Sequence, residues 1–138
     1  MALKEGYKGY KDLVAEATAR IETVTAEQAR AWFGDPGVVF VDIRDPRELQ
    51  RDGMIPGAFH ATRGMLEFWV DPASPYHKPV FASGKRFVFY CAGGMRSALA
   101  TDTVKTMGLA PVCHIEGGFK AWKDAGYPVD QPPRPKHA

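Results

Sequence analysis

The chain has 138 residues, of which 45% are hydrophobic, and this is enough for one domain with a single hydrophobic core. Its 18 lysine and arginine residues nearly balance its 16 acidic residues, and the resulting net charge of +2 argues against nucleic acid as a main partner. No stretch reaches the ~18 apolar residues needed to span a bilayer, and no secretory apolar run occurs near the start. We therefore expect a cytoplasmic location and no membrane partner.

The first elements expected along the chain are two helices. Residues 10–21 carry apolar side chains four positions apart, which is typical of an amphipathic helix that lays one stripe against a core. Thr25 and Gln28 fit a capping box, in which each side chain satisfies a free backbone amide of the first turn. A second, short helix should therefore follow Thr25 and run to about Phe33. The turn residues at 35–37 end this segment.

Three short apolar runs indicate the strands of a sheet. Residues 38–41 and 87–90 are continuous runs of β-branched and aromatic residues, the pattern of strands that are buried on both faces. A third run, residues 111–115, follows a helical segment that ends at Gly108. Strands and helices thus alternate in the second half of the chain, which predicts an α/β fold around a mostly parallel sheet.

The remaining segments define the expected domain organisation. We expect a helical extension over residues 1–20, one domain over residues 21–130 and an extended tail over residues 131–138, where three of the eight residues are proline. Residues 63–85 are predicted to form a long connection. Residues 64–70 are compatible with a short helix, but prolines and a glycine interrupt the rest of the connection.

The most informative segment is residues 87–100, where a strand ends at Cys91, two glycines follow, and a helix begins near Arg96. Gly93 and Gly94 can adopt positive φ, so the chain can curl around the sulfur with its amides pointing inward, and such a curl binds anions. The positive end of the following helix adds to this effect. The pattern therefore favours the thiolate form of Cys91, which is the nucleophilic form.

Two plainer interpretations of this segment stay open. An isolated cysteine is most often a small buried residue, although a core cysteine needs neither the glycine pair nor the helix start. Arg96 is either a solvated residue of the first helical turn or a partner for an anion, because a positive charge at a helix N-terminus is mildly unfavourable by itself.

Three segments, in order along the chain, resemble the signatures of the rhodanese family. They are residues 41–44 with Glu48 and 53–58, residues 91–97, and residues 117–122 with 126–129. The similarity spans roughly residues 21–129, and three ordered matches are more specific than any one of them. Met54 replaces the histidine that the first signature usually has. The resemblance implies a rhodanese-like α/β fold: a central parallel five-stranded sheet flanked by helices on both faces, with the cysteine loop at the carboxyl ends of the strands.

The resemblance also implies a function. A sulfurtransferase of this family moves a sulfane sulfur from a donor such as thiosulfate to a thiophilic acceptor, cyanide or a thiol, through a persulfide on the catalytic residue, Cys91. The other residues of the loop would bind the substrate, and Arg96 would orient the donor. These residues are Ala92, Gly93, Gly94, Met95, Arg96 and Ser97. Asp42 and Arg44 match family positions near the mouth of the active site and would support it. The alternative for them is a surface ion pair worth under ~1 kcal/mol.

Two other functions are compatible with the same motifs. A sulfur-carrier or regulatory module would form the persulfide but pass it only to a specific protein partner. Related phosphatases and arsenate reductases use a loop one residue longer than the four residues between Cys91 and Arg96, so the resemblance disfavours them. The sulfur chemistry needs no cofactor, and the four histidines have no spacing that suggests a metal site.

Two further features of the sequence each have two possible interpretations. Cys113 lies within the third apolar run and is expected to be a packed strand residue, with a resolving thiol as the alternative. Aromatic residues of the long connection either pack it onto the body of the domain or form a lid over the cysteine loop. They are Phe68, Trp69, Tyr76 and Phe81.

Overall fold

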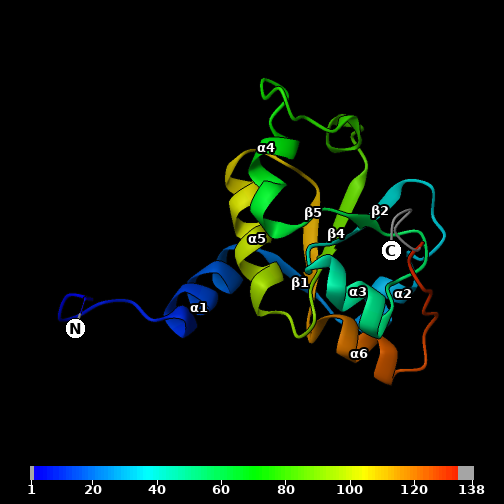
Figure 1. The fold of residues 1–138 in the computed structure, drawn as a ribbon, viewed down its shortest axis with the longest axis horizontal. Helices are drawn as coiled ribbons and strands as arrows, with labels where there is room; N and C mark the ends of the chain where they lie inside the picture. The colour runs from blue at the N-terminus through cyan, green and yellow to red at the C-terminus, as the bar shows by residue number, and fades with distance from the viewer. Residues whose placement is uncertain (1, 134–138) are drawn as a thin grey trace.

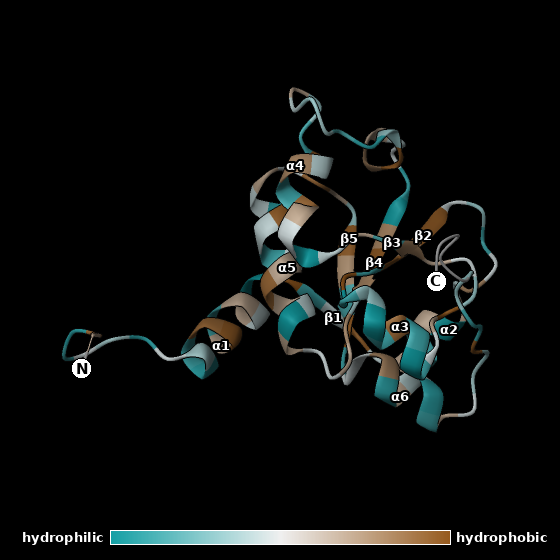
Figure 2. Cartoon of the chain, viewed as in Figure 1, coloured by the Kyte–Doolittle hydropathy of each residue, from teal (hydrophilic) through white to brown (hydrophobic). Residues whose placement is uncertain are grey.

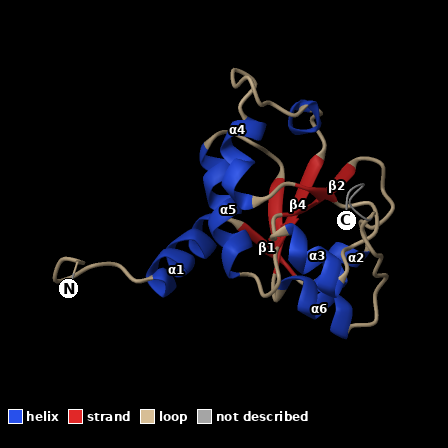
Figure 3. Ribbon diagram, viewed as in Figure 1, coloured by secondary structure: helices blue, strands red, loops and turns tan. Residues whose placement is uncertain are grey.

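The computed structural model describes residues 2–133, and these form a five-stranded sheet covered by helices on both faces (Figures 1 and 3). The strands lie in the order β1, β5, β4, β2, β3, and every neighbouring pair is parallel. Their bounds are β1 Glu22–Val24, β2 Val38–Asp42, β3 Phe59–His60, β4 Arg86–Tyr90 and β5 Val112–Ile115. The predicted parallel five-stranded sheet is confirmed.

Over the same residues, six α-helices and two short 3-10 helices connect the strands. Their bounds are α1 Tyr10–Arg20, α2 Ala26–Arg30, α3 Pro46–Asp52, α4 Leu66–Val70, α5 Met95–Thr106 and α6 Gly118–Asp124, with the 3-10 turns at Arg63–Met65 and Pro79–Ala82. Helices α1 and α4 both pack on α5, whereas α2 packs on α6. The two groups cover opposite faces of the sheet, as predicted for helices on both faces.

Side chains that alternate along the central strands build one core on each face of the sheet. On the α5 face, Val41 and Phe89 pack with Val104 of α5. On the α6 face, Val88 packs with Trp122 of α6. Because both faces are buried, β2 and β4 are apolar at nearly every position, and the apolar strands lie at the centre of the molecule in Figure 2.

The second helix is shorter than predicted. The capping box is present, since the Thr25 amide donates to the Gln28 side chain at 2.9 Å and the Gln28 amide donates to the Thr25 hydroxyl at 3.1 Å. However, α2 ends at Arg30 instead of near Phe33. Backbone hydrogen bonds between residues three apart tighten the next segment into turns. These turns bring the Phe33 ring to 5.8 Å from that of Trp122, so tertiary packing overrides the helical pattern.

The long connection after α4 crosses the amino ends of the strands, away from the Cys91 loop (Figure 1). Phe81 is buried there and stacks on Phe87 near the start of β4, with 5.5 Å between the ring centroids. Trp69 packs edge-on against Phe59 at 6.0 Å. Two other aromatic residues of this region are exposed: Phe68 and Tyr76. The lid hypothesis is therefore wrong, and the alternative of a packing cluster is confirmed for Trp69 and Phe81.

The N-terminal helix α1 is attached to the body through α5. Arg20 at its end donates two hydrogen bonds to the carboxylate of Asp102 in α5, at 2.9 and 2.6 Å. Residues 2–9, which precede the helix, have no regular structure and extend away from the body (Figure 1). No helix within residues 2–133 is long and apolar enough to cross a bilayer.

The described end of the chain lies against the segment that follows α3. Asp130 and Met54 exchange two backbone hydrogen bonds of 2.8 Å, and the Gln50 side chain donates to the Pro133 carbonyl at 3.4 Å. Met54, where the family signature has histidine, thus takes part in this contact through its backbone. Residues 131–133 have no regular secondary structure, and the rest of the predicted tail, residues 134–138, lies outside the described residues.

Candidate active site

Cys91 follows β4 directly, at the carboxyl ends of the strands, and the chain then turns into α5. The turn depends on Gly94, which has a φ of +104° and precedes the first residue of the helix. The amides of Gly94 and Ser97 donate to the Cys91 sulfur at 3.1 and 3.3 Å. The Ser97 hydroxyl lies 3.5 Å from the same sulfur. Three polar groups of the predicted loop therefore surround the sulfur.

Cys91 is also buried, with only 1% of its surface exposed, and it belongs to the core on the α5 face. The alternative interpretation of Cys91 as a small buried residue predicts this burial. The inward amides distinguish the site from an ordinary core cysteine, because an apolar environment gives a thiol no hydrogen-bond donors. The sulfur thus lies beneath its loop, and the open surface begins at the neighbouring Ala92.

The start of α6 fixes the loop from the other side. The amides of Phe119 and Lys120 donate to the carbonyls of Cys91 and Ala92, at 2.8 and 3.1 Å. Gly118 permits this approach, because a Cβ atom built there would lie 2.5 Å from the Cys91 carbonyl oxygen, and its φ is +58°. This segment, which belongs to the third family signature, therefore holds the cysteine loop.

Arg96 is held by a carboxylate at the edge of the loop. Its two terminal nitrogens each donate to the Glu48 carboxylate at 2.9 Å. The same carboxylate caps α3 by accepting from the Asp45 amide at 2.9 Å. The hydrogen bond from Arg96 lowers the pKa of Glu48 from its ordinary value. Arg96 therefore links α5 to α3, and an orienting role toward an anionic donor stays a prediction.

Asp42 and Arg44 form a buried ion pair at the end of β2, with 0% and 1% of their surfaces exposed. The Arg44 guanidinium donates to the Asp42 carboxylate at 2.7 Å and to the Gly53 carbonyl at 2.7 Å, and it lies 4.5 Å from the centre of the Phe119 ring. The alternative of a surface ion pair is therefore wrong. Removing one partner of a buried pair typically costs about 3–5 kcal/mol, so the pair helps to fix α6, and through it the loop.

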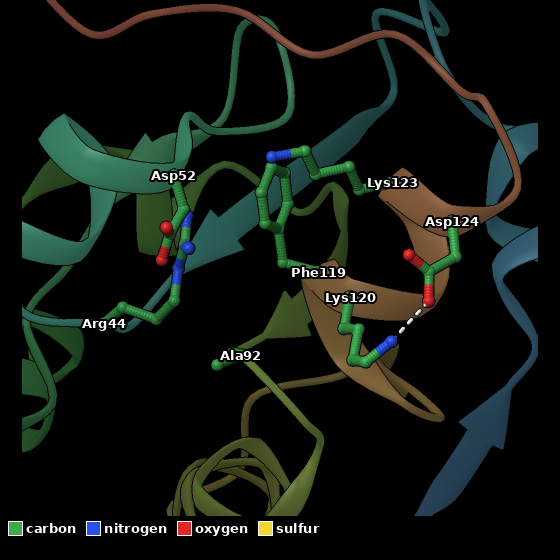
Figure 4. Close-up of a pocket in the computed structure, with 7 residues that line it drawn as sticks. All are labelled: Arg44, Asp52, Ala92, Phe119, Lys120, Lys123 and Asp124. Atoms are coloured by element: carbon green, nitrogen blue, oxygen red, sulfur yellow. Dashed lines mark hydrogen bonds and ion pairs between the residues drawn. The ribbon is translucent and has the colours of Figure 1, made fainter.

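A cleft of about 190 Å³ opens beside the loop at Ala92 (Figure 4). It is lined by Arg44, Asp52, Ala92, Phe119, Lys120, Lys123 and Asp124. Lys120 is paired with Asp124 at 2.6 Å, whereas Lys123 has no ion pair among residues 2–133. The cleft is smaller than the roughly 300–1,000 Å³ of sites for drug-sized ligands, so its size suits a small ligand. The two lysines were not identified from the sequence, because the helix that carries them was not placed beside the loop.

A second group that the sequence did not assign to the site is His114 of β5. Its Nδ1 lies 2.9 Å from the Ser97 hydroxyl oxygen, and its Nε2 lies 3.1 Å from the Thr23 hydroxyl oxygen of β1. Burial lowers its pKa to about 4, so the ring is neutral at neutral pH. In the described part of the chain, no three histidine, cysteine, aspartate or glutamate residues gather as a metal site would require.

Cys113, the second cysteine, lies on the opposite face of the sheet. It is fully buried among the residues that pack against α6. Burial raises the pKa of its thiol to about 12, so the thiol stays protonated. The interpretation as a packed strand residue is confirmed, and the sheet separates it from Cys91.

Comparisons with known proteins identify the family of the chain. The family model of the rhodanese-like domain matches residues 25–125. An uncharacterized protein of Synechocystis sp. is 30% identical over 116 residues, which are 84% of this chain and 60% of that protein. The thiosulfate sulfurtransferase/rhodanese-like domain-containing protein 3 of Mus musculus is 27% identical over 104 residues, which are 72% of this chain and 66% of that protein. The chain thus spans less than two thirds of these curated relatives.

Solved structures give the same result. A protein of unknown function from Rhodopseudomonas palustris, described as a possible tyrosine phosphatase, is 58% identical with a TM-score of 0.90, and the match covers 94% of this chain and 99% of that one. The polysulfide-sulfur transferase homodimer of Wolinella succinogenes is 26% identical with a TM-score of 0.67, and the match covers 93% and 91% of the two chains. The chain belongs to the rhodanese-like domain family.

Proposed function

We propose that the chain is a sulfurtransferase that takes a sulfane sulfur from a donor such as thiosulfate and passes it to cyanide or a thiol through a persulfide on Cys91. The observation that carries this proposal is the set of donors around the sulfur, the amides of Gly94 and Ser97 at 3.1 and 3.3 Å. Hydrogen bonds to an anion are stronger than those to a neutral group, so these donors favour a thiolate over a thiol. The thiolate is the form that attacks sulfur.

The reaction has two steps. The Cys91 thiolate attacks the outer sulfur of thiosulfate, the sulfur–sulfur bond of the donor breaks, and sulfite leaves with the bonding electron pair. An acceptor anion then attacks the outer sulfur of the persulfide, and the Cys91 thiolate is restored. The negative persulfide would be stabilised by the loop amides. Lys123, on the cleft wall without an ion pair among the described residues, supplies positive charge for an anionic donor.

Intact-mass measurement after incubation with thiosulfate tests the covalent step. The native protein is expected to gain the mass of one sulfur atom, and cyanide should remove it with release of thiocyanate. Cys91→Ser should neither gain this mass nor turn over, because the serine hydroxyl is not ionised at neutral pH. Cys113→Ser is the matched control and should retain both activities. Sulfur uptake by Cys91→Ser, or its loss in Cys113→Ser, contradicts the assignment.

A carrier role is the neighbouring alternative. A carrier would form the same persulfide but would not pass the sulfur to any small acceptor, so mass gain without turnover supports it. We propose a cytoplasmic location for either role, since both cysteines are free thiols and a reducing compartment keeps them so.

A phosphatase is the second candidate, because the R. palustris relative at 58% identity is described as a possible tyrosine phosphatase. Two features weigh against it. Only four residues separate Cys91 from Arg96, one fewer than in the phosphatase loop, and Arg96 is already bound to Glu48. Hydrolysis of p-nitrophenyl phosphate separates the two functions. Turnover that depends on Cys91 would favour the phosphatase, and we expect none.

A further inference from the structure

A chain of hydrogen bonds connects the Cys91 sulfur to the surface of the molecule. The sulfur lies 3.5 Å from the Ser97 hydroxyl oxygen, this oxygen lies 2.9 Å from Nδ1 of His114, and Nε2 of His114 lies 3.1 Å from the Thr23 hydroxyl oxygen. The sulfur-transfer reaction proposed above uses neither His114 nor Thr23.

The sheet places the members of this chain on one face. His114 is the direct partner of Thr23 in the pairing of β1 with β5, and of Phe89 in the pairing of β4 with β5. Cys91 lies two residues after Phe89 and therefore on the same face. His114 is only 4% exposed, whereas Thr23 lies exposed on the edge strand. A buried imidazole thus lies between the active-site hydroxyl and an exposed one.

The imidazole can bond its two neighbours in two ways, because a neutral ring donates through one nitrogen and accepts through the other. Beside a protonated Cys91, the thiol donates to Ser97, the Ser97 hydroxyl donates to Nδ1, and Nε2–H donates to Thr23. Beside a Cys91 thiolate, all three bonds reverse: the Thr23 hydroxyl donates to Nε2, Nδ1–H donates to Ser97, and the Ser97 hydroxyl donates to the sulfur. The lowered pKa of His114 agrees with a neutral ring in both arrangements.

We propose that His114 is a positioning residue for Cys91: its tautomer follows the protonation state of the thiol, and the hydrogen-bonded chain passes the thiol proton to water at Thr23. The S–H bond breaks with its electron pair left on the sulfur. Ser97 and His114 each receive one proton and pass one on, and Thr23 receives one and releases one to water. No imidazolium forms, and the only net change is the loss of the thiol proton.

The Ser97 hydroxyl has a competing acceptor, the Gly94 carbonyl oxygen at 3.2 Å. A thiolate is a stronger acceptor than a neutral carbonyl, so ionisation of Cys91 draws the hydroxyl hydrogen to the sulfur. This is possible only when Nδ1 carries its hydrogen and leaves the hydroxyl free to donate elsewhere. The tautomer of His114 therefore determines whether Ser97 can stabilise the thiolate.

Charged groups surround this chain on every element that packs against it. Near Cys91, most are paired with each other: Glu48 with Arg96, Asp42 with Arg44, and Lys120 with Asp124, while Lys123 lines the cleft. On the elements around His114, they are Arg20 of α1 with Asp102 and Lys105 of α5, and Glu22 of β1 with Arg86 of β4, of which the last two lie beside Cys113 on the other face of the sheet. Among residues 2–133, none of these groups forms a hydrogen bond or ion pair with Ser97 or His114. The relay is thus a neutral path.

Nitrogen-15 NMR of the imidazole tests the proposal on the native protein. The pH midpoint of Cys91 ionisation is first measured from the rate of alkylation by iodoacetamide, located at Cys91 by peptide mass. His114 is expected to carry its hydrogen on Nε2 below this midpoint and on Nδ1 above it. Cys91→Ser is the control and should keep one tautomer over the same pH range. A native His114 with the same tautomer on both sides of the midpoint overturns the proposal.

A variant measurement supplies the second test. His114→Phe removes both ring nitrogens and should raise the alkylation midpoint by about one pH unit, which lowers the rate about tenfold at pH values below the midpoint. His77→Gln, in the connection far from the loop, is the matched control and should leave the midpoint unchanged. An unchanged midpoint in a folded His114→Phe protein overturns the proposal, and the NMR test decides if this variant does not fold. The proposal shares only the reactive Cys91 with the proposed function, and neither readout uses a sulfur donor, so the two can fail separately.

Discussion

Lys123 is the residue whose charge should matter most for capturing an anionic donor. It lies exposed on the wall of the cleft beside Ala92, and it has no ion pair within the described part of the chain, in contrast to Lys120. An exposed charge contributes about 0.2–1 kcal/mol, so Lys123→Gln should raise the KM for thiosulfate by a factor of about 1.4 to 5 and leave kcat nearly unchanged. Steady-state kinetics at low salt measure this change, since salt screens such attractions.

Lys85→Gln is the matched control for this prediction. Lys85 is also exposed, but it precedes β4 at the amino ends of the strands, whereas the cleft lies at their carboxyl ends. Its replacement changes the net charge by the same amount and should leave KM unchanged. Equal effects of the two substitutions would mean that only the total charge of the molecule attracts the donor.

At the same scale, the sequence predicted the Gly94 and Ser97 amides that face the sulfur but not the groups around the loop. Cys91, Gly94 and Ser97 are neighbours in the chain, so a strand followed by glycines and a helix was enough to predict inward-facing amides. His114 and Lys123 are near the loop only because β5 lies beside β4 and α6 packs under the turn. Contacts of this kind depend on the pairing of distant segments, which local patterns do not specify.

Of the glycines, Gly118 is the one where an added Cβ atom would lie nearest to a neighbouring atom, and this atom belongs to the cysteine loop. Gly118→Ala would place a Cβ atom 2.5 Å from the Cys91 carbonyl oxygen, and because this oxygen is part of the backbone, either the loop or the start of α6 must move. A displacement of about 1 Å near reacting atoms can lower a rate about a hundredfold, and we expect such a loss of sulfur transfer. Overpacking adds about 1–3 kcal/mol of destabilisation, which urea unfolding would measure.

Gly84→Ala separates the overlap from the backbone strain. Gly84 has a φ of +76°, so alanine is strained there as it is at position 118, but a Cβ atom would meet no neighbour within 4 Å. The left-handed conformation of the alanine should lower the stability of this variant by only ~1–2 kcal/mol, and the variant should keep its activity. If Gly118→Ala were as active as Gly84→Ala, close packing of α6 would not be needed to hold the loop.

Element by element, the longer and more apolar strands were predicted and the two shortest strands were not. Strands β2, β4 and β5 and helices α1 and α5 lie within a residue or two of the expected positions. Strands β1 and β3 have three and two residues and lie at the two edges of the sheet, too short for any periodicity to show. The five strands therefore followed from the family resemblance, whereas the residue pattern predicted only three.

For the whole molecule, the buried ring of His114 predicts how stability depends on pH. In the unfolded chain this histidine takes up a proton near pH 6.5, whereas burial lowers its pKa to about 4 in the folded protein. Between these values the unfolded state binds more protons, so the free energy of unfolding falls as the pH decreases from 6.5 to 4. A shift of this size corresponds to about 3 kcal/mol when complete. Urea unfolding at a series of pH values from 7.5 to 4.5 measures the loss.

Comparison with two glutamine variants assigns this loss to His114. His114→Gln cannot take up the proton, so its unfolding free energy should fall by roughly 2–3 kcal/mol less than that of the native protein over the same range. His77→Gln, which leaves His114 in place, should keep the native slope. Carboxylates also contribute to the pH dependence of stability, and the hydrogen bond from Arg96 lowers the pKa of one of them, Glu48. Such a group loses its contribution to the free energy of unfolding only as the pH falls through its lowered pKa, which lies below most of this range. Parallel curves for the native protein and His114→Gln would show that protonation of this ring does not couple to folding.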